Sequence, residues 1–558
     1  MRTFVCVAVL LFAMWAQAAE PGPQSSAFAN SLVFGSFSIR ANAEAEAARL
    51  KARFLHDVHV YPIDTSQGTR YRVATGILGP ADMQTVSRSA QSQGIAFWRQ
   101  YVSGLEGQMK LSNEASAQPL ADRDSASANE HGAAADPSSS TAVVSSKLVA
   151  TIPTVPQSSP STAATRQKNA DFIQSTLDFD VGLQTRGYAQ KGADGQDQLD
   201  LSASGRLKYH REWDDGLRSV TITPFFRYDQ SDSERTHFDI RELFWSGVGD
   251  EWEFHVGARQ IFWGVTEFNH LVDIINQTDL VENIDGEDKL GQPMVQVSLT
   301  RDFGLLEFFL LTGFRERTFP GPDGRLRLPV PIDTDRPIYE SAAGNKRVDA
   351  AARWSKTFGP TEVGVYHFSG TNRDPQFVPE IQPGGELVLR PMYNVIDQTG
   401  VEALTILGDW ALKLEMITRS GDGDRYEAFT TGFERTFVGL FGGRSDVGLV
   451  LEYMFDERGE LATNTPLEND VAFGTRLRLN DVDDSQALFG LIWDVETQEY
   501  MLSLEASRRL GNTWTLFLEG RAFSGADEVD PNDYFNAQNK SGFLQRDDFI
   551  QLELTRYF

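Results

Sequence analysis

Charged side chains alternate with apolar ones in the C-terminal part of this 558-residue chain. In residues 199–210, polar residues such as Arg206 and Lys208 occupy the even positions, and apolar or small residues occupy the odd ones. A period of two places alternate side chains on opposite faces of a β-strand, one wet and one apolar. Cations on a wet face can attract an anionic or sugar-like solute, unless neighbouring carboxylates pair with them. We expect five basic side chains on such faces: Arg206, Lys208, Arg227, Arg241 and Arg259.

Residue patterns that could support catalysis are weak in the same region. His237 lies two residues from Asp239 on one face of a predicted strand, a pairing that hydrolases use. No nucleophile motif such as G-x-S-x-G lies near these two residues. We therefore expect that the chain is not an enzyme and uses no cofactor.

The stretch 265–292 is rich in carboxylates. Its acidic cluster at 285–288 lacks the spacing of a calcium-binding loop, so we predict no metal site there. The length of the stretch leaves two interpretations, a constriction folded into a pore or a solvated outer loop. The carboxylates are Glu267, Asp273, Asp279, Glu282, Asp285, Glu287 and Asp288.

The elements that would position these residues are segments of about ten residues with alternating polarity. Trp410, Leu412 and Leu414, for example, alternate with Lys413 and Glu415. From 171 to 558 we count 18 candidate strands. They begin near residues 175, 199, 218, 236, 251, 293, 305, 347, 361, 396, 409, 424, 445, 468, 484, 499, 513 and 547.

The connections between these strands are alternately short and long. Tight breaks such as 214–216 and 358–360 fall on even-numbered connections, whereas 265–292, 318–346 and 525–546 are odd-numbered ones. This alternation is typical of an outer-membrane β-barrel, which has tight periplasmic turns and extended outer loops. A large soluble β-sandwich or propeller is the alternative that we consider for these strands.

The last residues also favour a membrane barrel. Ile550, Leu552 and Leu554 share one strand face with the terminal Phe558, which resembles the terminal signal that the outer-membrane insertion machinery recognises. Arg556 interrupts the apolar face at the third-last position.

Charge and cysteine content restrict the function further. The net charge of −27 argues against a nucleic-acid binder, which needs cations for the phosphates. Residues 1–170 carry a net +2, so residues 171–558 hold −29. The only cysteine, Cys6, lies in residues 1–18, which have the basic start, apolar stretch and A-x-A exit of a cleaved signal peptide. An exported chain without cysteine excludes disulfides and thiolate chemistry.

A small α+β module is predicted between residues 28 and 103. Asn42 can cap a first helix, and Pro80 suits the first turn of a second. With the strands, the order is βαββαβ, that of a split-βαβ fold with one sheet face covered by two helices. The predicted strands are 31–37, 58–63, 71–78 and 95–102.

Two sequence elements of this module, V-F-G-S-F-S at 33–38 with A-N-A-E at 41–44, and Y-R-V at 71–73, resemble the SPOR domain of bacterial cell-envelope proteins. The resemblance implies a domain that binds peptidoglycan glycan strands through the uncovered sheet face. It assigns Ser36 and Arg72 to binding, and Arg70 stands where some members have an aromatic residue. Val33 replaces a glutamine that many members carry. A SPOR-like fold that has lost glycan binding is the alternative.

The segment 104–170 is rich in Ser, Ala and Pro and has no aromatic residue. It cannot bury enough apolar surface to offset its ordering entropy, so we predict a disordered linker. The linker could tether two fixed sites or act as a passive spacer.

The sequence thus predicts a mainly β protein, an approximately 18-stranded transmembrane antiparallel barrel (171–558) preceded by the small α+β domain. Its expected function is a porin-like channel in the outer membrane of a Gram-negative bacterium, tethered to the cell wall by the periplasmic SPOR-like domain. The alternative is a non-conducting barrel that anchors this domain at peptidoglycan, for example at division sites. Expected partners are peptidoglycan, outer-membrane lipid and lipopolysaccharide, the insertion machinery and a small solute that the sequence does not identify.

Overall fold

The structure is a computed structural model, and its chain divides into two units, the first containing most of residues 1–126 and the second most of 127–558. The two units are described separately. The predicted signal peptide 1–18 and linker 104–170 lie outside the described residues. These residues are 30–37, 40–53, 58–65, 68–75, 86, 98–101, 174–443, 445–459, 465, 467–525 and 541–558.

The N-terminal unit contains a four-stranded sheet with the order β2-β3-β1-β4. Helix α2 (Arg40–Arg53) follows the first strand and buries Ala43, Ala47 and Leu50. The helix begins at Arg40, so Asn42 lies inside its first turn rather than capping it, which corrects the sequence prediction. The predicted second helix lies outside the described residues except for the buried, helical Val86. The strands are β1 (Asn30–Phe37), β2 (Val58–Thr65), β3 (Gly68–Thr75) and β4 (Trp98–Tyr101).

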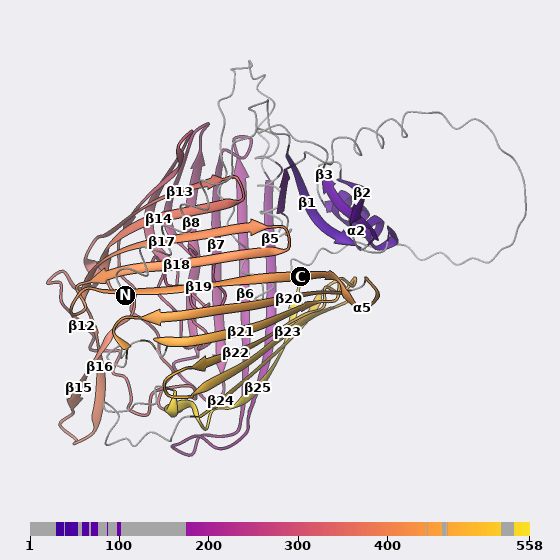
Figure 1. The fold of residues 1–558 in the computed structure, drawn as a ribbon. Coiled ribbons are helices and arrows are strands. Elements are labelled where there is room, and N and C mark those ends of the chain that lie inside the picture. The colour runs from indigo at the N-terminus through magenta and orange to yellow at the C-terminus, as the bar shows by residue number, and fades with distance from the viewer. Residues whose placement is uncertain are drawn as a thin grey trace, which may run out of the picture. The chain divides into compact units, whose positions relative to one another are not determined.

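In the second unit, eighteen strands of the described residues form a closed antiparallel barrel (Figure 1). These strands are β5 (Gln174–Tyr188), β6 (Leu199–Trp213), β7 (Arg218–Asp229), β8 (His237–Val248), β9 (Trp252–Arg259), β10 (Gln292–Arg301), β11 (Gly304–Leu311), β13 (Asp349–Phe358), β14 (Thr361–Thr371), β17 (Val395–Leu407), β18 (Trp410–Ser420), β19 (Tyr426–Gly439), β20 (Ser445–Asp456), β21 (Asn469–Arg478), β22 (Gln486–Asp494), β23 (Tyr500–Leu510), β24 (Trp514–Ser524) and β25 (Phe549–Tyr557).

The predicted strand positions are confirmed, because each of the 18 predicted starts lies within two residues of an observed one. The short and long connections also alternate as predicted. The turn 214–217 between β6 and β7 is tight because Asp214, Asp215 and Gly216 all take positive φ values. We call the end of the barrel that carries such turns the short-turn end and the opposite end the long-loop end.

Two pairings close the wall of the barrel. β25 pairs with β5, and β9 pairs with β10, so the first and last strands are neighbours and no strand of the wall has a free edge. A small separate sheet of β12 (Ile338–Tyr339), β16 (Leu387–Tyr393) and β15 (Gln376–Ile381) forms within the long loops. The closed wall leaves no row of unpaired backbone groups at a sheet edge, as a membrane-spanning sheet requires.

The short helical segments lie in the connections. They are η1 (Gly344–Lys346), α5 (Leu440–Gly443) and η4 (Gly542–Leu544). Among the described residues, no helix is long and apolar enough to span a membrane.

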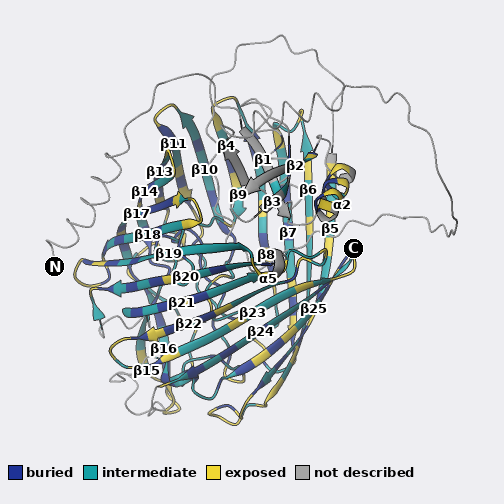
Figure 2. Cartoon of the chain, turned by 45° about the vertical axis from the view of Figure 1, so that its right-hand side comes forward, coloured by how far each residue is buried: buried dark blue, intermediate teal, exposed yellow. Residues whose placement is uncertain are grey.

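The barrel reverses the polarity of a soluble protein. Large apolar side chains on the outward face are exposed, with Leu177 62%, Phe238 65% and Ile550 63% accessible. Charged side chains on the inward face are buried, with Glu415 0% and Arg227 3% accessible. Figure 2 shows this alternation of buried and more exposed residues along the strands. An apolar outer band around a polar interior is the pattern of a barrel that faces lipid.

Candidate functional site: the loop-filled lumen

The inward faces of the strands carry the basic residues that the sequence predicts. Arg206 on β6 forms an ion pair with Asp180 at 2.9 Å and stays 35% exposed, and Lys208 on the same face is exposed. Arg259 on β9 donates to Gln296 and lies over the ring of Phe244 at 4.8 Å. Arg206 and Lys208 lie in the half of the wall toward the short-turn end, and this half therefore keeps water-accessible charge.

The connection between β9 and β10, residues 260–291, folds into the barrel. We call this segment the lumen loop. Val272, Ile275 and Asp279 on it are each 0% exposed, which no solvated outer loop would allow. The structure therefore supports the first of the two interpretations of this stretch, a constriction.

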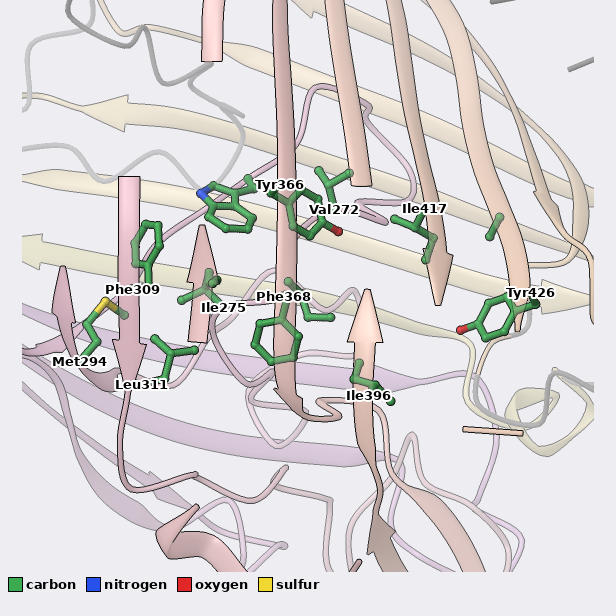
Figure 3. Close-up of a cluster of buried hydrophobic side chains, with 14 residues drawn as sticks. Val272, Ile275, Met294, Phe309, Leu311, Tyr366, Phe368, Ile396, Ile417 and Tyr426 are labelled. Atoms are coloured by element: carbon green, nitrogen blue, oxygen red, sulfur yellow. The ribbon is translucent and has the colours of Figure 1, made fainter. Parts of the chain in front are cut away.

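An apolar cluster holds one side of the lumen loop against the wall. Figure 3 shows Val272 and Ile275 of the loop among inward side chains of the strands β10 to β19. Trp263 of the loop packs edge-on against Phe309 at 5.5 Å between ring centroids. The loop therefore covers this part of the inner wall. The wall side chains of the cluster are Met294, Phe309, Leu311, Ala351, Tyr366, Phe368, Ile396, Ile417, Tyr426 and Ala428.

The carboxylate of Glu415 on β18 binds the backbone of the lumen loop. It accepts hydrogen bonds from the amide N–H of Val265 at 2.7 Å, of Thr266 at 2.9 Å and of Val272 at 3.2 Å. The Thr266 hydroxyl donates to the same carboxylate at 2.6 Å. One fully buried side chain thus organises a turn of the loop that lies about 150 residues earlier in the sequence.

A second wall carboxylate, Glu452 on β20, repeats this arrangement. It accepts the amide N–H groups of Glu267 at 2.8 Å and of Phe268 at 3.0 Å. The Glu267 side chain in turn pairs with Arg476 on β21 at 2.5 Å and lies 3.8 Å from the Lys413 ammonium. The tip of the loop is therefore tied to three neighbouring regions of the wall.

The far arm of the lumen loop presents carboxylates to the basic residues of the opposite wall. Asp279 pairs with Arg241 at 2.5 Å, and Glu282 pairs with Arg227 at 2.7 Å. Arg235 donates to the carbonyl of Val281 at 2.8 Å. Two of the five predicted pore-lining cations are thus neutralised by acids of the loop, which is the pairing alternative raised by the sequence.

Burial alone would raise the pKa of the Glu282 carboxyl. The Arg227 and Arg235 guanidinium groups outweigh burial and hold its pKa well below the usual range. Glu282 is therefore ionised in the folded loop over the physiological pH range. Breaking such a buried pair from one side costs about 3–5 kcal/mol, because the other charge stays buried without a partner.

The long connection between β11 and β13 packs at the long-loop end of the barrel. Arg315 pairs with Asp239 on β8 at 2.8 Å, and Arg325 pairs with Asp547 before β25 at 2.5 Å. Arg373, after β14, donates to the carbonyl of Ile275 of the lumen loop at 3.1 Å. Arginines of the outer loops thus tie separate parts of the long-loop end together.

One part of the lumen loop stays exposed. Glu287 is accessible to solvent, whereas the side chain of Asp285 is 17% exposed and pairs with Arg521 on β24 at 3.0 Å. Carboxylate oxygens of Asp285, Glu505 on β23 and Glu519 on β24 lie within 4.8 Å of one another. Enclosure by the barrel and the neighbouring carboxylates of Asp285 and Glu505 raise the pKa of Glu287 well above that of an ordinary glutamate. We call this region, Asp285 to Asp288 with Glu505, Glu519 and Arg521, the acidic constriction.

The His237 and Asp239 pair does not form a catalytic group with a nucleophile. His237 Nδ1 lies 3.0 Å from the carbonyl oxygen of Arg235, and His237 Nε2 lies 3.6 Å from Glu282. Within the described ranges, no hydroxyl or thiol hydrogen-bonds to this imidazole. The geometry therefore offers no activated nucleophile at His237.

The residues assigned by the SPOR resemblance lie on two adjacent strands of the N-terminal sheet. Ser36 is in β1, and Arg70 and Arg72 are in β3, next to β1 in the sheet. Their side chains are outside the described part of the structure, so the resemblance remains the basis of their assignment.

Sequence reasoning located the wall cations and the loop acids but not their partners. The carboxylates Glu415 and Glu452 alternate with apolar residues like any inward residue, so no local signal marks them as binding sites for a loop. Arg235, Arg373 and the outer-loop arginines were not singled out either, because their role depends on contacts between distant segments.

No protein-family model and no curated protein matches the sequence. The structure is similar to crystal structures of Pseudomonas aeruginosa OpdO, with 9% identity, a TM-score of 0.40 and coverage of 69% of this chain and 96% of that one. It is also similar to a BenF-like porin from Pseudomonas fluorescens Pf-5, with 11% identity, a TM-score of 0.41 and coverage of 69% and 98%. At sequence identities and TM-scores this low, the similarity assigns no family, solute or functional site to this chain.

Removing a wall carboxylate should loosen the lumen loop. We predict that Glu415→Gln weakens the closed position of residues 260–291 by about 1–3 kcal/mol, because one amide-binding oxygen is lost and an NH₂ group faces the loop donors. Hydrogen exchange of the loop amides measures the effect. Glu212→Gln is the control, because this half-exposed carboxylate contacts His210 and not the loop. Unchanged exchange in Glu415→Gln would contradict the role of this side chain.

Acidification should open the lumen loop. Burial lowers the pKa of His270 to about 4, whereas an open loop would restore a value of about 6.5. Between these two pH values the open loop binds a proton that the closed loop does not, so falling pH favours opening. Limited proteolysis of the loop at pH 7 and pH 5 measures this shift. His270→Asn should show a weaker pH dependence, and an identical dependence in both proteins would exclude His270 as the cause.

Proposed function

We propose that this chain is an outer-membrane channel whose lumen is narrowed by the loop 260–291. The observation that carries the proposal is the reversed polarity of the closed barrel, with exposed apolar side chains outside and buried charges inside. An outward apolar band requires lipid, and an 18-stranded wall is wide enough to enclose an aqueous lumen. The secretory signal predicted for residues 1–18 and the alternation of short turns and long loops agree with this location.

The route for solute would follow the part of the wall that the lumen loop leaves uncovered. The apolar cluster blocks the side of β10 to β19. Accessible inward charges remain at Arg206 and Lys208 toward the short-turn end, and at Glu287 of the acidic constriction. A hydrophilic solute would therefore follow these accessible charges, past the contacts that Glu267 and Asp285 of the loop make with β21 and β24.

The charge of this route favours cations at its narrow part. Arg227 and Arg241, which would suit an anionic solute, are occupied by Glu282 and Asp279. Several carboxylates meet at the acidic constriction, where Asp285, Glu505 and Glu519 share Arg521 as an ion-pair partner and Glu287 is exposed. Fixed negative charge at a constriction raises the local concentration of cations.

We predict that the purified full chain conducts ions in planar bilayers and prefers cations. This preference should increase as the pH rises above the range in which an ordinary glutamate titrates, because the raised pKa of Glu287 keeps its carboxyl protonated at lower pH and ionised at higher pH. Reversal potentials in a salt gradient at several pH values provide the measurement. Glu287→Gln should reduce both the preference and its pH dependence.

Glu212→Gln serves again as a matched control, because Glu212 is an accessible carboxylate near the short-turn end, away from the constriction. An anion preference, or equal effects of both substitutions, would contradict the acidic constriction. A folded barrel with no conductance would contradict the channel and favour the anchor function.

We further propose that the N-terminal module tethers the barrel to the cell wall. The SPOR resemblance, together with the sheet order β2-β3-β1-β4 expected for a split-βαβ fold, supports this role. The short-turn end, which faces the periplasm in barrels of this kind, is where β5 begins, so the module would lie on the side of the peptidoglycan.

Sedimentation with isolated peptidoglycan tests the tether. The full chain should sediment with amidase-treated peptidoglycan, and Ser36→Ala with Arg72→Ala should reduce the bound fraction severalfold, since Arg is the principal charged contact that the resemblance assigns. Arg53→Ala, at the end of helix α2 and off the sheet, is the control. No sedimentation of the unaltered chain would favour a module that has lost glycan binding.

A further inference from the structure

Two arginines on the outward face of the barrel have no role in the proposed channel. Arg435 on β19 stands directly across from Trp410, the first residue of β18. Its guanidinium carbon lies 4.8 Å from the centre of the Trp410 ring and 4.6 Å from that of Phe437. Glu434, the preceding residue, faces Lys413 inside the lumen, so Arg435 points outward.

The last strand repeats this arrangement. Arg556 on β25 stands across from Trp514, the first residue of β24. Its guanidinium carbon lies 5.3 Å from the Trp514 ring centre and 4.6 Å from that of the terminal Phe558. Arg556 shares its face with Ile550, which is 63% exposed, so this side chain also points outward.

Neither arginine has an acidic partner in the described parts of the chain, and the Nε atom of Arg435 is buried without a hydrogen-bond acceptor. The inward arginines differ, because most of them face a carboxylate. Lys356 on β13 lies on the same outward face near the short-turn end, over the Phe358 ring at 5.5 Å. The Lys356 ammonium donates to the carbonyl of Asp302 at 2.9 Å. The two arginines are held by aromatic rings and keep their charge available to a further ligand.

The position of these cations along their strands indicates which kind of ligand they could bind. Each lies within a few residues of the short-turn end, where tight turns or the C-terminus follow. An arginine on the lipid-facing side is costly at the membrane midplane and tolerated near the interface. The guanidinium groups therefore fit the level of the headgroups in the periplasmic leaflet, with their aromatic neighbours at the boundary of the acyl chains.

We propose that Arg435 and Arg556, each with its cross-strand tryptophan, bind the phosphodiester headgroup of anionic phospholipids in the periplasmic leaflet. A guanidinium offers several donors that match phosphate oxygens, and the indole ring packs on the adjoining chain. The proposal rests on the outer-membrane placement above. It also accounts for Arg556, the residue that interrupts the apolar face of the final strand.

The spacing of the two sites favours lipid over one protein partner. β19 and β25 are separated by five strands, which corresponds to roughly 30 Å around the wall. Two equivalent sites at that distance match a ring of separate lipid molecules. Between the sites, the outward face carries the exposed Leu451, Phe473 and Leu504 in mid-strand, and near the short-turn end it carries Arg508, which is already paired with Asp483.

Lipid retention by the full chain tests the proposal. The protein is folded into vesicles of equal parts phosphatidylglycerol and phosphatidylcholine, extracted with mild detergent, and its retained lipids are counted by native mass spectrometry. The unaltered chain should retain phosphatidylglycerol preferentially. Arg435→Gln with Arg556→Gln should lower this preference by about fivefold for each arginine. Arg218→Gln is the matched control, because Arg218 stands across from Trp213 at the same end but pairs with Asp214 at 3.4 Å.

Each outcome bears on a different statement. Failure of the unaltered chain to insert into vesicles contradicts the membrane placement itself. Insertion without phosphatidylglycerol preference, or equal preference in the double variant, overturns the lipid sites. A double variant that retains lipid normally but assembles poorly in cells would indicate that the arginines bind a protein partner. This result would also overturn the lipid sites. If the glutamine variants do not fold, Arg435→Lys with Arg556→Lys and a salt titration of the unaltered chain replace them, and a preference that salt leaves unchanged overturns the proposal.

Discussion

Every backbone N–H and C=O group in the wall of this barrel must find a partner within the protein, because lipid hydrocarbon offers none. The pairing of β25 with β5 and of β9 with β10 meets this requirement by leaving no edge in the wall. Closure then fixes the alternation of faces, since each strand has one side toward lipid and one toward the lumen. The apolar outside and the charged inside follow from that single constraint.

The same closure creates a large interior that the chain partly fills with its own loops. The lumen loop enters with a backbone that is not in regular structure, so its amide groups need acceptors. Glu415 and Glu452 supply them from the wall, and the hydrophobic cluster around Val272 and Ile275 removes apolar surface from water. Buried carboxylates, aromatic packing and ion pairs thus hold one loop in a fixed position inside the barrel.

The contacts of the lumen loop explain where part of the negative charge of the barrel segment is used. Acids of the lumen loop neutralise Arg227 and Arg241, which reverses the expectation based on strand residues alone. Glu287, whose carboxylate stays accessible, lies at the acidic constriction. In the proposed channel, selectivity would depend on which charges pair and which remain exposed, and the net charge of the segment would not decide it.

The sequence by itself determined the strands of this protein, because a period of two is local and each segment shows its two faces without knowledge of its neighbours. The alternation of short turns and long loops likewise followed from the spacing of these strands. Helix α2 shows a limit of such local signals, since the helix begins before the expected cap at Asn42. Only the tertiary structure decided that Thr266 meets Glu415 and that Asp285 meets Arg521, residues 149 and 236 positions apart. Such pairs depend on the path of a loop across a closed barrel, and no period or motif in the chain encodes that path.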